Sequence, residues 1–160
     1  MNTIIKVDYI NPFLLAAKSV FRSLLNVELK KGKMVKTENI EPTNDVIINI
    51  DFSGDLNGFV IYNMGFNTVH KIAEALVPGL SEDQVEDEYK DIIGEMANMI
   101  TGNAINQLAE NGISISTPVI MDREDFMLNR FRNYLILSIN FYSPFGQIEI
   151  IIATKQAKKK

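Results

Sequence analysis

The sequence predicts an α/β protein of the α+β type, in which two long helices and a shorter one pack on a mainly antiparallel sheet. Two segments, about 12–26 and 87–111, carry apolar residues at helical spacing. Each is followed by two apolar runs on either side of a glycine-containing turn, which is typical of a β-hairpin. Because the order helix then strands occurs twice, we expect two similar halves.

The composition is that of one globular domain. The chain has 160 residues, of which 46% are hydrophobic and 22% are charged. We expect one domain over 1–154 and a basic tail over 155–160. The absence of cysteine excludes disulfides and thiol chemistry, and a net charge of −4 argues against a general nucleic-acid surface. With no signal-peptide pattern and no apolar run near the ~20 residues that span a bilayer, we expect a cytoplasmic protein and no membrane partner.

The first half is expected to contain a helix and a hairpin. Asn11 followed by Pro12 is typical of an N-cap and a first helical position, so the helix is placed from there to about 26. Residues 30–33, Lys-Lys-Gly-Lys, are interpreted as the exposed tip of a turn between two short strands. The runs 46–52 and 59–62 flank a turn with two glycines and predict the first hairpin.

The middle of the chain is expected to be helical. A short helix is predicted over 68–77, with Asn67 as its cap. The acidic stretch 81–88 leads into the long helix, because negative charge is favourable at the N-terminal end of a helix. Asn111 and Gly112 have the composition of a helix C-cap.

The last third is expected to be mainly β. Residues 113–121 alternate apolar and polar side chains and predict a strand that is interrupted at Pro118. Residues 122–132 form a charged connection with room for one helical turn, and 134–142 and 147–154 predict the second hairpin.

The long helix has a polar face that stands out in this pattern. With 100° per residue, Asp91, Glu95, Asn98 and Gly102 fall together on the side that faces solvent. Opposite them lie the apolar residues Ile93, Met96, Ile100, Ala104 and Leu108. Gly102 has no side-chain bulk, so another surface could approach the helix closely there.

Most catalytic chemistries lack support in the sequence. His70 is the only histidine, and no GxSxG, Walker A, GxGxxG or EF-hand pattern accompanies it, so no metal or nucleotide site is expected. What remains is Glu95 and Asn98: a carboxamide can hold a water in one orientation, and a carboxylate can bind a partner's lysine. Bare Glu-x-x-Asn is a common pattern, and it recurs at Glu41 to Asn44, so an ordinary solvated helix face stays an alternative.

Three segments together resemble the CheC/CheX/FliY family of chemotaxis phosphatases. Asp91-x-x-x-Glu95-x-x-Asn98, followed by Pro118, resembles the family signature, and 52–62 resembles its strand–turn–strand segment. The resemblance extends over about 11–153. With one copy of the signature, on the second helix, the chain is most similar to the CheX members, and a CheC/CheX-like fold is implied.

The resemblance implies a function and a partner. The family dephosphorylates the phospho-aspartate of the response regulator CheY. By carry-over, Asn98 would orient the attacking water, Glu95 would pair with a CheY lysine, and Asp91 would support the helix or the contact with the partner. The open position at Gly102 is also expected to bind the partner. Mg²⁺ would be held by CheY and no cofactor by this chain. A homodimer is also implied, and the C-terminal strands are expected to offer edges for it.

Two alternatives stay open beside this enzyme. The first is a non-catalytic module that binds CheY or other flagellar-switch components, since related proteins use a similar fold in that way. The second is a structural domain with no role in signalling.

Overall fold

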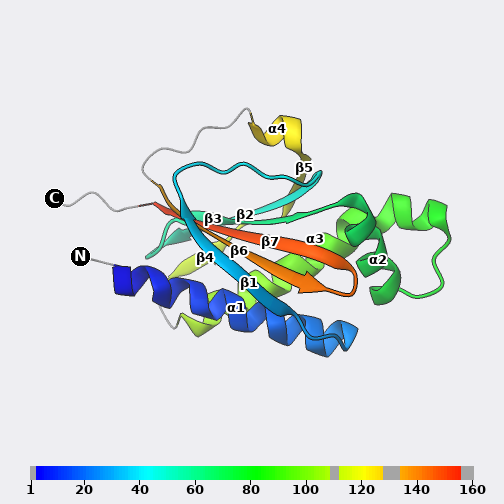
Figure 1. Cartoon of the computed structure of the whole chain (residues 1–160), viewed down its shortest axis with the longest axis horizontal. Coiled ribbons are helices and arrows are strands. Elements are labelled where there is room, and N and C mark those ends of the chain that lie inside the picture. Colours follow the sequence, from blue (N-terminus) through cyan, green and yellow to red (C-terminus); the bar gives the residue numbers. More distant parts are fainter. Residues whose placement is uncertain (1–2, 109–111, 128–133, 156–160) are drawn as a thin grey trace.

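The computed structural model describes residues 3–108, 112–127 and 134–155 (Figure 1). It contains helices α1 (Thr3–Leu25), α2 (Phe66–Leu76), α3 (Glu82–Gln107) and α4 (Arg123–Met127). Its strands are β1 (Lys30–Thr37), β2 (Val46–Gly54), β3 (Gly58–Met64), β4 (Ile113–Ile115), β5 (Val119–Asp122), β6 (Tyr134–Ser143) and β7 (Gly146–Lys155). The α/β prediction with an antiparallel-rich sheet is confirmed.

The sheet shows the relation between the two halves of the chain. All its pairs are antiparallel, in the order β1-β6-β7-β3-β2-β4, and β5 also pairs with β2. The first half runs α1-β1-β2-β3, and the second runs α3, then β4 and β5, then β6-β7. The strands correspond as β1 to β4 and β5, β2 to β6, and β3 to β7. With this correspondence the strand order is the same from either edge of the sheet, because β1 pairs with β6 while β4 and β5 pair with β2. Each half therefore gives its first strand to the hairpin of the other, and the predicted two-fold arrangement is confirmed.

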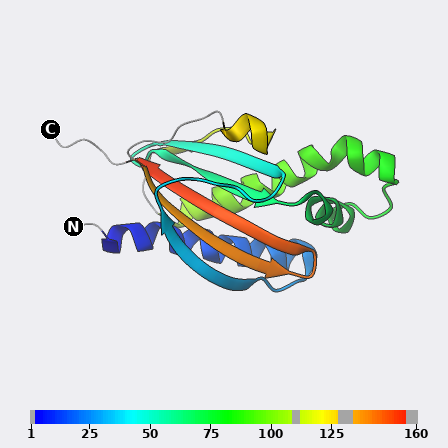
Figure 2. The same ribbon diagram turned by 45° about the horizontal axis from the view of Figure 1, so that its top comes forward.

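Both faces of the sheet carry buried apolar side chains. Helices α1, α2 and α3 cover one face, and the short α4 lies on the other (Figures 1 and 2). Successive strand residues alternate between the two cores: Ile48 packs under the long helices, while Ile47 belongs to the smaller cluster with Phe126 of α4. None of the described helices is long and apolar enough to span a membrane.

Local sequence patterns predicted most of the elements. Both hairpins form as predicted, with β2 paired to β3 and β6 paired to β7. The interruption at Pro118 is also confirmed, because β4 and β5 both pair with β2 and are separated by 116–118. The short helix α2 begins slightly earlier than predicted, at Phe66. Its cap residue is Gly65, not Asn67, and Gly65 makes no side-chain capping bond.

The predicted start of the first helix was wrong. Helix α1 begins at Thr3, and Pro12 lies inside it. A proline inside a helix costs about 3 kcal/mol, because it removes one backbone hydrogen bond. Ile10 and Phe13, on either side of it, are buried in the core, and burying such a side chain contributes about 1.5–3 kcal/mol. Burial therefore offsets the cost of carrying the helix through Pro12.

The basic turn predicted at residues 30–33 was also wrong. These residues begin β1, an edge strand whose register with β6 shifts between Lys31 and Met34. A Cβ at Gly32 would lie 2.6 Å from the Tyr142 ring, so glycine gives the room that this irregularity needs. Exposed lysines along an edge strand oppose pairing with another chain.

The long helix begins earlier than predicted, at Glu82 instead of 87. Ser81 and Gln84 form a capping box: the Ser81 hydroxyl accepts from the Gln84 backbone N–H at 3.2 Å, and the Gln84 side chain accepts from the Ser81 N–H at 2.9 Å. The helix ends at Gln107, before the predicted cap. Asn111 lies outside the described residues.

The C-terminal strands do not offer the edges that were expected for dimerisation. Strand β6 lies between β1 and β7, and β7 lies between β6 and β3. Both strands are paired on two sides, so that route to a dimer was wrong. The homodimer itself stays a prediction. The basic tail was predicted from 155, but Lys155 is the last residue of β7, and 156–160 lie outside the described residues.

Candidate active site on helix α3

The exposed face of α3 is the one that helical spacing predicted. Asp91, Glu95 and Asn98 are exposed and Gly102 is half-buried, while the opposite residues pack in the core. The opposite residues include Ile93, Met96, Ile100 and Ala104. The carboxylate and the carboxamide therefore stand one turn apart on the surface.

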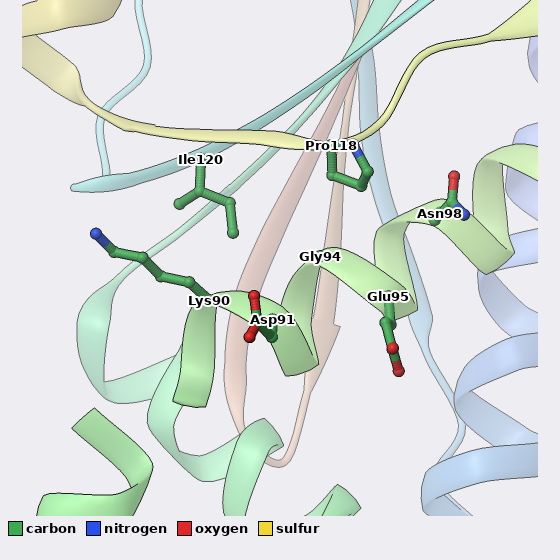
Figure 3. Close-up of a pocket in the computed structure, with 7 residues that line it drawn as sticks. All are labelled: Lys90, Asp91, Gly94, Glu95, Asn98, Pro118 and Ile120. Atoms are coloured by element: carbon green, nitrogen blue, oxygen red, sulfur yellow. The ribbon is translucent and has the colours of Figure 1, made fainter. Parts of the chain in front are cut away.

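Three of the four predicted residues share one cleft. This cleft of about 330 Å³ lies between α3 and the segment that leads into β5 (Figure 3). Its wall is formed by Lys90, Asp91, Gly94, Glu95, Asn98, Pro118 and Ile120. Gly102 is not part of the wall, and a Cβ placed there would have no neighbour within 4 Å.

The polar groups of the cleft point in different directions. Figure 3 shows the Asn98 carboxamide on the side of α3 where Pro118 lies, while the Glu95 carboxylate projects away from Pro118. Within the described part of the chain, neither side chain makes a hydrogen bond or an ion pair. Both groups are therefore available to a molecule outside the chain.

The Pro118 segment packs against α3 beside Gly94. A Cβ at Gly94 would lie 3.6 Å from Pro118 Cβ and 3.7 Å from Ile120 Cδ1, which is ordinary van der Waals contact. On the other side, Ser116 fixes the segment to β2. Its backbone N–H donates to the Asp51 carbonyl at 2.8 Å, and its hydroxyl accepts from the Asp51 N–H at 2.9 Å. Pro118 is thus held beside the helix by packing and by hydrogen bonds.

Beneath the site, a chain of hydrogen bonds ties α3 to the centre of the sheet. The Thr101 hydroxyl donates to the Ala97 carbonyl at 2.8 Å, so the Tyr62 hydroxyl, 2.7 Å away, must donate to Thr101 Oγ1. Tyr62 lies on β3, and both side chains are buried. The Ala97 carbonyl belongs to the peptide group that carries Asn98, so this bond chain helps to fix the backbone from which Asn98 projects.

We expect Tyr62 to make the free energy of unfolding fall as the pH rises above about 10. Burial raises the pKa of its hydroxyl above the ordinary value of about 10, so the folded chain keeps a proton that the unfolded chain releases. Below pH 10 both states keep the proton and the effect is absent. Above it, Tyr62 lowers the stability by about 1.4 kcal/mol per pH unit.

The measurement is urea unfolding over this pH range for wild type and Tyr62→Phe. The variant is expected to show a shallower decline, because it cannot ionise at this position. Equal declines in the two proteins would contradict a buried, protonated Tyr62.

His70 lies away from the cleft. Its Nε2 is 3.3 Å from a Glu86 carboxylate oxygen, and its ring packs edge-on against Tyr89 with centroids 5.2 Å apart. Burial, and the nearby Glu86 charge, raise the pKa of Tyr89. This cluster joins α2 to α3, in keeping with a structural histidine. No group of three or more His, Asp or Glu side chains suited to a metal gathers within the described ranges.

Comparison with known proteins decides the family. The family model described as "Chemotaxis phosphatase CheX" matches residues 46–141, which include β2, β3, the whole of α3 and the Pro118 segment. The chain belongs to the CheX family. The resemblance seen in the signature around Glu95 and Asn98 is therefore confirmed at the level of the family.

Relatives of the CheX family match over most of their length. The CheY-P phosphatase CheX of Thermotoga maritima is 26% identical over 136 residues, which are 84% of this chain and 88% of that protein. The structure of the CheX-CheY-BeF3-Mg²⁺ complex from Borrelia burgdorferi matches with a TM-score of 0.75 and 26% identity, over 92% of this chain and 98% of that one. A CheC-like superfamily protein from Shewanella sp. PV-4 matches with a TM-score of 0.80 and 25% identity, over 94% and 99%.

Sequence reasoning missed part of the cleft. Lys90 and Ile120 line it, but neither was singled out in the sequence. Pro118 was the signal that could have identified Ile120. Because Pro118 belongs to the same family signature as residues of α3, the segment around Pro118 should lie against that helix, and Ile120 is two residues further along this segment. For Lys90 the signal was its charge, which contrasts with the acidic residues around it.

Proposed function

We propose that this chain accelerates hydrolysis of the phospho-aspartate of a CheY response regulator. The observation that carries the proposal is the pair Glu95 and Asn98 in a member of the CheX family. Both side chains are exposed on one wall of a cleft, and neither has a partner among the described residues. The Thermotoga maritima relative, named a CheY-P phosphatase, supports the same substrate. We also propose that the chain acts in the cytoplasm, as expected from the sequence.

In the proposed mechanism, Asn98 holds the attacking water. Its carboxamide oxygen accepts a hydrogen bond from the water, which turns a lone pair toward phosphorus, and its N–H groups can donate to oxygens near the reacting group. Phosphoryl transfer depends mainly on positioning and on charge stabilisation, so a neutral group suffices for this task. Asn98 therefore need not act as a base.

Glu95 has a different role in the proposal. Its carboxylate accepts a hydrogen bond from the lysine ammonium of the partner's active site, which fixes α3 in register with the phospho-aspartate. Mg²⁺ is supplied by the partner in this mechanism. The Borrelia burgdorferi complex, which contains CheY, BeF3 and Mg²⁺, supports such an arrangement.

Asp91 and Gly102 are proposed to contact the partner without taking part in the chemistry. Asp91 lies in the cleft one turn before Glu95. The open space at Gly102, one turn beyond Asn98, leaves room for the partner's backbone to approach α3.

The test is the decay of phosphorylated CheY with and without this protein. We expect faster loss of the phosphoryl group at a catalytic amount of the protein. Unchanged decay with no binding would overturn the proposal. Binding to phosphorylated CheY without any change in its lifetime would instead support the non-catalytic binding module.

We also propose that the chain forms a homodimer, as the resemblance to CheX implies. Sedimentation at tens of micromolar is expected to show two copies. A monomer at that concentration would contradict the proposal. In either case the contact cannot be made by adding a strand to β6 or β7, because both are already paired on two sides.

A further inference from the structure

The charge pattern of α3 singles out Lys90. Helix α3 carries one basic residue and seven acidic ones, and the basic residue lies on the wall of the cleft. The acidic residues are Glu82, Asp83, Glu86, Asp87, Glu88, Asp91 and Glu95. A helix with this excess of negative charge must approach a partner whose active site holds a phospho-aspartate, so Coulomb repulsion opposes the encounter.

The Lys90 ammonium has no internal role that would explain its position. Lys90 is exposed, and within the described part of the chain it forms no ion pair. One turn earlier, Glu86 lies beside His70, and one turn later the position is Gly94. In Figure 3 the Lys90 side chain extends away from Glu95 and Asn98, on the Ile120 side of the cleft.

Lys90 lies far along α3 from Asn98, the residue proposed to hold the attacking water. Asn98 lies eight residue positions after Lys90, which is a rise of about 12 Å along the helix axis at 1.5 Å per residue. Because the Lys90 side chain also extends away from Asn98, it does not point toward a phosphoryl group whose attacking water is held by Asn98 (Figure 3). It can reach an anionic side chain on the surface around the partner's active site.

We propose that Lys90 determines specificity by pairing with a carboxylate on the rim of the partner's active site. This inference rests on the proposed function and deepens it, because it states the charge that a cognate response regulator has to present. Pairing at the rim speeds association and disfavours regulators that carry a basic residue there. It leaves the chemical step unchanged.

The experiment compares Lys90→Gln with wild type at several salt concentrations, by phospho-CheY decay and by affinity for phosphorylated and unphosphorylated CheY. At low salt we expect KM to rise about fivefold, as for loss of one exposed ion pair, with kcat unchanged. Affinity should fall for both forms of CheY, and the salt dependence should become weaker. Lys90→Arg should restore KM, because it keeps the charge.

Lys71→Gln is the matched control, because Lys71 is an exposed lysine on the neighbouring helix α2. An equal effect at Lys71 would show a general charge effect and overturn the inference. A fall in kcat, or weaker binding of the phosphorylated form alone, would assign Lys90 to the reacting group and overturn it too.

The outcomes separate the two proposals. Wild type that binds CheY without accelerating its decay overturns the phosphatase proposal, while the affinities still test Lys90. Wild type that accelerates decay, with Lys90→Gln unchanged in KM and affinity, overturns only the inference about Lys90. Wild type that does neither overturns both.

Discussion

Asn98→Ala is expected to abolish the acceleration of phospho-CheY decay while leaving the fold intact. The substitution removes the group that holds the water, and loss of one well-placed hydrogen-bonding group at a reacting centre typically lowers a rate about 100-fold or more. KM should change little, because the interaction is made mainly in the transition state. The decay assay under saturating phospho-CheY measures this loss.

The fold should tolerate the change because Asn98 is exposed and makes no side-chain hydrogen bond within the residues that the structure describes. Alanine is also a better helix former, so the free energy of unfolding should stay within about 0.5 kcal/mol of wild type or rise. Asn103→Ala is the matched control. Asn103 is also exposed on α3, but it lies five residues after Asn98 and therefore faces another direction. Full activity in Asn98→Ala, or equal losses in both variants, would refute the role given to Asn98.

The direction of the Asn98 side chain was predictable because its cause is local. The geometry of an α-helix fixes where each side chain points relative to its neighbours, so the apolar stripe of α3 determined which residues face solvent. The hairpins were predictable for the same reason, since alternation and turn glycines lie within a few residues of each other. Neither feature depends on distant parts of the chain.

The wrong predictions concern features whose cause is not local. Lys30 to Lys33 have the composition of a turn, and only pairing with β6, about a hundred residues later, makes them a strand. Pro12 looks like the start of a helix, and only burial of Ile10 against the rest of the fold carries α1 through it. In both places tertiary contacts outweigh local preference.

The cleft itself also depends on non-local packing. Its two walls belong to α3 and to the segment around Pro118, which pack against each other beside Gly94. The spacing within α3 could therefore predict Asp91, Glu95 and Asn98 as one exposed face, but it could not show that Lys90 and Ile120 complete the wall. The resemblance supplied Pro118, which is the one residue of the second wall that the sequence indicated.

Glu95→Ala is expected to fail in a different way from Asn98→Ala. A hydrogen bond to a charged group contributes about 1.5–3 kcal/mol, so loss of the carboxylate should lower kcat/KM by roughly 10-fold to 150-fold. Most of the change should appear as a higher KM, because Glu95 is proposed to bind the partner's lysine before the reaction. Kinetics over a range of phospho-CheY concentrations separate the two parameters.

Two further variants decide whether the charge or the position of Glu95 matters. Glu95→Gln keeps the shape and one acceptor but loses the charge, so it should recover only part of the lost kcat/KM if a lysine is the partner. Glu74→Ala, at an exposed glutamate on α2, controls for the change in net charge. If a double variant that carries both Glu95→Ala and Asn98→Ala still accelerates the decay of phospho-CheY, the reaction does not use this face of α3. The cleft would then be a binding surface, and the catalytic groups would lie elsewhere.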